Sequence, residues 1–212
     1  FIQKILVEII FLLTVTNVKI RKNLLKWSTY NKVKKVLKKG DVVVLGDLKT
    51  FLSLFADGPV THASIYIGHN KIIHARGNGI MYMTLGKIFK EYDTLAVFRI
   101  KKGTKKKNQI IKNTIKFAKK QLGKPYNYST RDSSEKFFCT QFVNESFKQA
   151  GYETGLKNHY DTHNLRSQML KIINKKGDIL QPTLFLRSNF DLIYNSPNLK
   201  VDNNFFSLEE QK

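Results

Sequence analysis

The sequence has 212 residues, with 37 Lys and Arg against 16 Asp and Glu and a formal net charge of +21. This length suits one domain, or one domain with a tail, and 42% apolar residues with 12% aromatic residues provide enough material for a buried core. The single cysteine excludes an intrachain disulfide and any metal site built from several thiolates. The positive charge implies an anionic partner or neighbourhood, and nucleic acid, anionic lipid and wall polymers satisfy it equally.

Residues 1–26 form a hydrophobic and basic segment ahead of the predicted domain. The chain starts at Phe1 and is mostly apolar over residues 5–18, a run that is shorter than the roughly 20 residues of a membrane span and contains Glu8. We expect the remnant of a signal sequence or an anchor here, with an amphipathic helix packed on the domain as the alternative. Such a remnant favours the cell envelope or secretion, and a cytoplasmic location stays open.

Two basic runs hold much of the net charge. Residues 19–39 contain nine Lys and Arg, residues 101–124 contain ten Lys, and neither run has an acidic residue. In the second run, apolar side chains recur at helical spacing, at Ile111, Ile115, Ala118 and Leu122. This spacing predicts an amphipathic helix over residues 101–123 whose lysines form either a solvated face or a contact with an anionic membrane or wall polymer. No aromatic side chains alternate with the lysines, which argues against a nucleic-acid partner.

Between the two runs, the sequence changes to short apolar segments with a period of two. The pattern predicts five strands, at residues 42–45, 63–67, 71–75, 79–83 and 95–100, joined in part by tight Gly- and Asn-containing turns into an antiparallel meander. A second helix follows at residues 139–150 and ends at Gly151. Strands first and helices later predict an α+β domain over residues 27–198. A weak helix signal at residues 164–174 and a tail over residues 199–212 complete the chain.

Cys139 lies at the predicted start of the second helix. Unpaired N–H groups and the helix dipole at this position lower the pKa of a thiol and supply donors for an oxyanion. A cysteine is nevertheless often a small buried apolar residue, so the catalytic interpretation needs a base.

Two histidines are candidates for that base. His62 stands at the head of a predicted strand, where it could serve as general base for a thiol and then as general acid for the leaving group. His74 lies in the next strand, and hairpin pairing could bring both side chains together on one face. The alternative for both is a hydrogen-bonded structural histidine. His159 and His163, four residues apart, could bind zinc, but no Glu general base accompanies them.

Four short motifs follow one another in the chain: Gly40-Asp41-Val42-Val43, Thr61-His62-Ala63, Gly123-Lys124-Pro125-Tyr126 and Phe138-Cys139-Thr140-Gln141. In this order and spacing they resemble the circularly permuted, YiiX-like branch of the NlpC superfamily of papain-like cysteine hydrolases. The resemblance covers residues 27–198. It implies a permuted papain-like fold of the α+β class, in which an antiparallel strand meander packs against helices.

The resemblance also implies a role for each matched residue. Cys139 matches the nucleophile, His62 the base and His74 the position that orients the base. That third position is a Glu in many permuted relatives and often a His in unpermuted ones. Tyr126 looks like a substrate-binding residue beside the pocket or the oxyanion, with core packing as its alternative. This chemistry requires no metal and no other cofactor.

Together these residues predict a cysteine hydrolase that cleaves an amide bond in a peptide or amino-acid conjugate, such as a peptide of peptidoglycan. Cys139 would attack the carbonyl, His62 would shuttle the proton, and water would release the thioester. Lipid acyl hydrolysis or acyl transfer at an anionic membrane is a second interpretation, since related permuted families act on acyl lipids. A non-catalytic basic binding module is a third.

Overall fold

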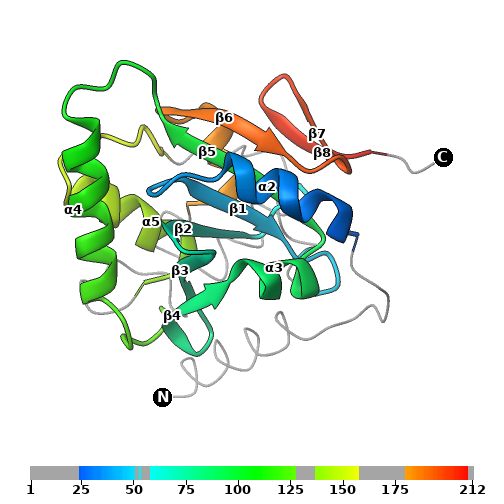
Figure 1. The fold of residues 1–212 in the computed structure, drawn as a ribbon, viewed down its shortest axis with the longest axis horizontal. Coiled ribbons are helices and arrows are strands. Elements are labelled where there is room, and N and C mark those ends of the chain that lie inside the picture. Colours follow the sequence, from blue (N-terminus) through cyan, green and yellow to red (C-terminus); the bar gives the residue numbers. More distant parts are fainter. Residues whose placement is uncertain (1–23, 51–52, 54–57, 128–136, 158–179, 210–212) are drawn as a thin grey trace, which may run out of the picture.

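A six-stranded antiparallel sheet is the framework of the protein (Figure 1). The structure is a computed structural model that describes residues 24–50, 53, 58–127, 137–157 and 180–209. The strands are β1 (Val42–Gly46), β2 (His62–Gly68), β3 (Lys71–Arg76), β4 (Gly79–Thr84), β5 (Thr94–Ile100) and β6 (Phe190–Asn195). They are ordered β4-β3-β2-β1-β5-β6, and each neighbouring pair is antiparallel.

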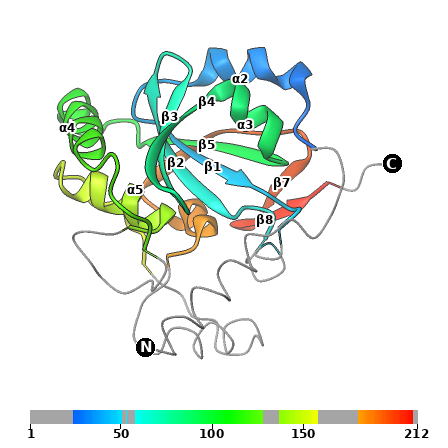
Figure 2. The same cartoon turned by 90° about the horizontal axis from the view of Figure 1, so that it is seen from below.

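Helices cover both faces of this sheet. They are α2 (Tyr30–Val36), α3 (Leu85–Glu91), α4 (Lys107–Lys120) and α5 (Cys139–Lys148), with 3-10 helices η1 (Trp27–Thr29) and η3 (Pro182–Arg187). Helices α2 and α3 lie together on one side, and α4 and α5 pack on the other (Figure 2). The sheet is therefore the middle of three layers, with a separate apolar core on each face.

The residue alternation along β1 explains the two cores. Val42 and Val44 join the core beneath α4 and α5, whereas Val43 and Leu45 join the core beneath α2 and α3. Successive side chains of a strand face opposite sides, so a strand covered on both faces is apolar throughout. All residues of β1 are buried accordingly.

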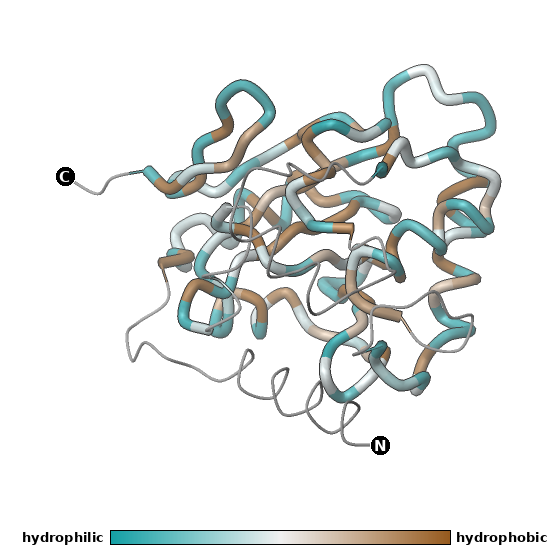
Figure 3. Tube along the Cα trace, turned by 180° about the vertical axis from the view of Figure 1, so that it is seen from behind, coloured by the Kyte–Doolittle hydropathy of each residue, from teal (hydrophilic) through white to brown (hydrophobic). Residues whose placement is uncertain are grey.

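The five predicted strands are all present, each longer by one or two residues than its sequence pattern indicated. The helix predicted over residues 101–123 is shorter, because Lys106 adopts a left-handed conformation with φ of 55° and α4 begins after it. The most buried residues of α4 are Ile110, Thr114 and Ala118, so its packed face is centred about one residue before the predicted stripe. Figure 3 shows apolar and polar residues alternating around the turns of this helix.

The tail predicted for residues 199–212 contains a β-hairpin. Its strands are β7 (Leu199–Asp202) and β8 (Phe205–Leu208), and Asn203 and Asn204 in the turn have the positive φ that asparagine tolerates. Leu199 and Phe206 are buried in the core beneath α4 and α5. The asparagine turn and this packing together order the hairpin.

Two expectations fall on residues outside the described ranges, namely the apolar segment at residues 5–18 and the helix at residues 164–174. Within the ranges that the structure describes, no helix has the length and apolar character needed to cross a bilayer.

Candidate active site

Strands β2 and β3 bring His62 and His74 into contact. The pairing of Tyr66 with Ile72 sets the register, and the even-numbered side chains of both strands share the face that α3 covers. His62 Nε2 lies 2.8 Å from His74 Nδ1, and the two rings meet edge to face at 81°. The expected approach of these two side chains is therefore confirmed.

The loop that leads into His62 is held tightly against the neighbouring strands. Thr94 Oγ1 on β5 donates a hydrogen bond of 2.6 Å to the carbonyl oxygen of Pro59. A Cβ atom added to Gly46 on β1 would lie only 2.0 Å from the same oxygen. Glycine at position 46 allows β1 to approach the Pro59 carbonyl closely. This contact fixes the start of β2, where His62 lies.

Cys139 is the first residue of α5 and is buried. Phe142, which is fully buried in the core, anchors the helix against the sheet. The Cys139 sulfur takes a hydrogen bond from the backbone N–H of Ala63 and lies 3.8 Å from Thr140 Oγ1. Since Ala63 directly follows His62, this contact brings the thiol to the strand end that carries the histidine pair.

Burial raises the pKa of the Cys139 thiol above its ordinary value. Hydrogen bonds from the N–H groups of Ala63, Thr140 and Cys139 and from the Thr140 hydroxyl act in the opposite direction, but burial dominates. This corrects the expectation of a lowered pKa at the helix start. The donors are present, yet the sulfur is removed from water, so its resting form is the neutral thiol.

Both histidines are neutral as well. Burial, followed by the charges of His74 and Arg76, lowers the pKa of His62 well below its ordinary value. Burial and then Arg76 lower the pKa of His74 to about 4. The nitrogen Nε2 of His74 has no hydrogen-bond partner among the described residues. The site therefore rests as a thiol beside neutral imidazoles and not as a thiolate–imidazolium pair.

The sequence patterns did not reveal Tyr92, which contacts the other side of His62. Tyr92 follows α3 and is 3% exposed, and its ring stacks on the His62 ring with centroids 6.0 Å apart and planes inclined by 16°. Burial raises the pKa of Tyr92 well above its usual value, so its hydroxyl stays protonated. The His62 imidazole is thus fixed at its edge by His74 and on its face by Tyr92. This contact joins separate segments, so no local motif could have indicated it.

Arg76 was also missed, because its position was assigned to a turn. The Arg76 guanidinium lies 6.0 Å from the centroid of the Tyr92 ring and forms an ion pair of 2.6 Å with Glu91. The period of two along β3 was a usable signal, since it places Arg76 on the same face as His74. The Arg76 charge adds to the effect of burial, which is the main reason that the pKa values of His62 and His74 are lowered.

Tyr126 is half-buried and packs against the core beneath α4 and α5. Its backbone pairs with that of Phe137, two residues before Cys139, and its loop is tied to β4 by the bond from Ile80 N–H to the Lys124 carbonyl oxygen. Its substrate-binding role stays a prediction. His159 and His163 lie outside the described residues, and within those residues no group of three or more His, Cys, Asp and Glu side chains could hold a metal ion.

Acid should destabilise the protein through the buried histidines. The pKa of His74 is 6.5 in the unfolded chain and about 4 in the fold, so the unfolded state binds more protons between these values. The contribution of neutral His74 to the free energy of unfolding is complete above pH 6.5. About 3 kcal/mol of this free energy is lost as the pH falls towards 4. Urea unfolding across this range should show a shallower pH dependence for His74→Asn than for the wild type. His69→Asn, in an exposed turn, is the control, and equal slopes in all three proteins would contradict the assignment.

Comparison with known proteins agrees with this geometry. Residues 36–190 match the family model described as permuted papain-like amidase enzyme, YaeF/YiiX, C92 family. The crystal structure of the metalloprotein yiiX from Escherichia coli O157:H7 matches with a TM-score of 0.59 and 18% identity, covering 76% of this chain and 98% of that chain, which shows a shared fold. No curated protein matches the chain. With the family model spanning most of its length, the chain belongs to the C92 family of permuted papain-like amidases, the YaeF/YiiX family.

Proposed function

We propose that this amidase cleaves an amide bond in a peptide or amino-acid conjugate, including peptides of peptidoglycan, through a thioester on Cys139. One observation carries the proposal: His62 contacts His74 at 2.8 Å on the strand end where the Ala63 N–H meets the Cys139 sulfur. A nucleophile, a base and a group that orients the base are the components a cysteine hydrolase needs.

The reaction starts from the neutral thiol and the neutral imidazole. The Cys139 sulfur attacks the carbonyl carbon while the thiol proton passes to His62, and a sulfur–carbon bond forms. His62 then gives this proton to the leaving nitrogen as the carbon–nitrogen bond breaks. Water, deprotonated by His62, attacks the thioester, releases the acid and restores the thiol.

His74 selects which nitrogen of His62 accepts the proton. Nε2 of His62 is engaged with His74, which leaves Nδ1 for the thiol. For Nδ1 of His62 to be the base, Nε2 of His62 must carry the ring proton and donate a hydrogen bond to Nδ1 of His74. A neutral His74 stabilises the resulting imidazolium less than a carboxylate would, so we expect it to act mainly by orienting His62.

Backbone amides at the start of α5 support the charge that develops on the carbonyl oxygen. The N–H groups of Cys139 and Thr140 are directed at the sulfur, close to where the oxygen of a tetrahedral intermediate would lie. As part of a helix anchored in the core, they require no reorganisation during the reaction.

Tyr92 is expected to act as a positioning residue for His62. Tyr92→Leu removes the stacked ring and should lower kcat about tenfold, because the imidazole plane is no longer fixed. Tyr92→Phe keeps the ring and should stay within about twofold of the wild type. Steady-state kinetics on both variants, with their folding checked by circular dichroism, distinguishes the two effects. If Phe is as damaging as Leu, the hydroxyl and not the stacking is what matters.

The substrate class is tested with matched amide and lipid substrates. Amino-acid anilides and peptidoglycan stem peptides should release free amine with the wild type and none with Cys139→Ala. Release of fatty acid from phospholipid vesicles without cleavage of any amide would contradict the proposal and favour acyl-lipid chemistry.

A further inference from the structure

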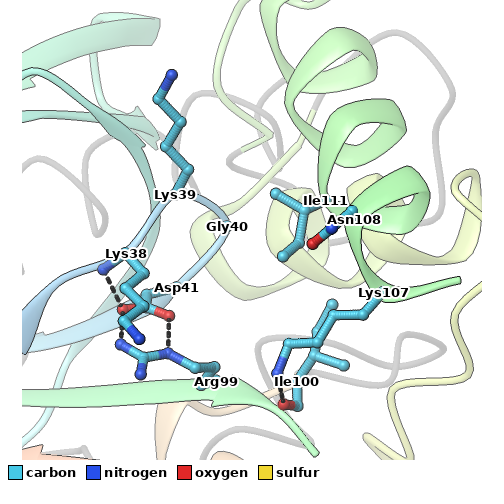
Figure 4. A pocket seen from close by; sticks show the side chains of 9 residues that line it. All are labelled: Lys38, Lys39, Gly40, Asp41, Arg99, Ile100, Lys107, Asn108 and Ile111. Carbon is cyan, nitrogen blue, oxygen red and sulfur yellow. Dashed lines mark hydrogen bonds and ion pairs between the residues drawn. The ribbon is translucent and has the colours of Figure 1, made fainter. Parts of the chain in front are cut away.

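A second candidate site lies at the end of β1 opposite to the histidine pair. A cavity of about 330 Å³ lies between the segment that precedes β1 and the first turns of α4 (Figure 4). Its lining residues are Lys38, Lys39, Gly40, Asp41, Arg99, Ile100, Lys107, Asn108 and Ile111. Asp41 directly precedes β1, whereas Leu45 near the other end of β1 pairs with His62. The cavity is therefore separate from the candidate active site.

The lining of this cavity carries a positive charge. Four lining residues are Lys or Arg, and Asp41 is the one carboxylate among them. Both oxygens of Asp41 accept hydrogen bonds from Arg99 at 2.7 Å, and one also accepts the Lys38 backbone N–H at 2.7 Å. The carboxylate is thus satisfied by groups of the wall, and the lysine charges are left without an acidic partner in the lining.

Several donors of the lining remain available. The structure gives no partner to the ammonium groups of Lys38 and Lys39 or to the amide of Asn108 among the residues it describes. Lys107 Nζ donates to the carbonyl oxygen of Ile100 at 2.8 Å, which fixes that ammonium in the wall with two further N–H groups. Figure 4 shows the Lys39 side chain running away from the cavity, and its stem lies against Gly68. The donors available at the cavity therefore come from Lys38, Lys107 and Asn108, on two separate segments of the chain.

The fold creates the cavity by joining the two basic runs of the sequence. A Cβ atom on Gly40 would lie 2.8 Å from the Ile111 side chain, so glycine lets the first run pass close to α4. Neither residues 19–39 nor residues 101–124 contain an acidic residue. The surface that the described residues of these runs, 24–39 and 101–124, contribute around the opening therefore adds only positive charge.

We propose that this cavity binds a phosphate group, either free or in a lipid headgroup. Lysine ammonium groups act as point charges towards phosphate, and a concave site with apolar walls, here Ile100 and Ile111, concentrates their field. The site goes beyond the amidase chemistry and does not depend on it.

Titration of the full chain with inorganic phosphate, followed by amide chemical shifts, tests the site. Saturable shifts should appear in residues 38–41 and 107–111 with a Kd of about 1 mM or below. The triple variant Lys38→Gln, Lys39→Gln, Lys107→Gln should raise this Kd about tenfold. The control replaces the same number of lysines elsewhere on α4, Lys112→Gln, Lys116→Gln and Lys119→Gln, and its Kd should stay within about twofold of the wild-type value.

Asn108→Glu, at an exposed position, introduces a carboxylate into the cavity and should also abolish phosphate binding.

Vesicles of phosphatidylcholine with and without phosphatidic acid distinguish the two sources of phosphate. If the triple variant of Lys38, Lys39 and Lys107 alone loses binding to vesicles with phosphatidic acid, the ligand is a lipid headgroup. If both triple variants bind these vesicles equally, the ligand is free phosphate. The proposal is overturned if chloride at equal ionic strength produces the same chemical-shift changes or if phosphate produces no saturable change. It is also overturned if the Kd for phosphate rises equally in both triple variants.

Discussion

Replacing Cys139 with Ala is expected to lower kcat/KM for an amide substrate about 10⁴-fold or more, because it removes the atom that forms the thioester. His62→Gln should cost about 10³-fold, since the thiol then lacks its base. In the double variant the two losses should not add, because residues that act in one step fail together. Additive losses, or a Cys139→Ala protein that keeps its turnover, would contradict the assigned roles. The alanine is small enough for the buried site, so thermal unfolding should be nearly unchanged and serves as the control.

The neutral resting state of the Cys139 thiol can be tested by alkylation. Because burial raises the pKa of Cys139, alkylation by iodoacetamide should be slow at mildly acidic pH and rise only at alkaline pH. Rapid labelling at mildly acidic pH would instead indicate a thiolate formed before substrate binds.

Gly46→Ala is expected to lower the free energy of unfolding by about 3 kcal/mol. The new Cβ atom would lie 2.0 Å from the Pro59 carbonyl oxygen, and neither backbone can yield without moving the strands that it joins. Activity should fall as well, since the displaced loop leads directly into His62. Urea unfolding and steady-state kinetics measure the two effects.

Gly86→Ala in α3 is the matched control for this substitution. Its Cβ atom would meet only the Trp27 ring at an ordinary 3.8 Å, and alanine favours a helix, so stability should rise by up to about 1 kcal/mol. Equal stability of the two variants would contradict the claim that close backbone approach at Gly46 positions the site.

The strands could be predicted from the sequence because burial on both faces leaves a short and nearly continuous apolar pattern, as in β1. The helices α2 and α3 were not predicted, because seven residues are too few for a helical period to repeat, and α2 has a single buried residue, Val33, among lysines and polar residues. The hairpin β7–β8 was taken for a tail, since the burial of Leu199 and Phe206 against distant elements is not visible in the local sequence.

The candidate site was predictable where it rests on local features. Cys139 at a helix start and His62 at a strand start each have a recognisable context, and hairpin geometry led to His74. Tyr92 reaches His62 only through the packing of α3, whereas the period of two along β3 could have placed Arg76 on the same face as His74. The sign of the Cys139 pKa shift also depends on burial, which outweighs the helix-start donors and is not visible in a short motif.

The central claim is that Cys139 carries the acyl group during turnover. Mass spectrometry of enzyme quenched in acid during reaction with a slowly hydrolysed amide measures this directly. The tryptic peptide of residues 137–148 contains the one cysteine of the chain and should gain the mass of the acyl group. The same peptide should stay unmodified when Cys139 is replaced by Ala. Turnover of the amide with this peptide never modified, under conditions where hydrolysis of the thioester is rate-limiting, would contradict the account.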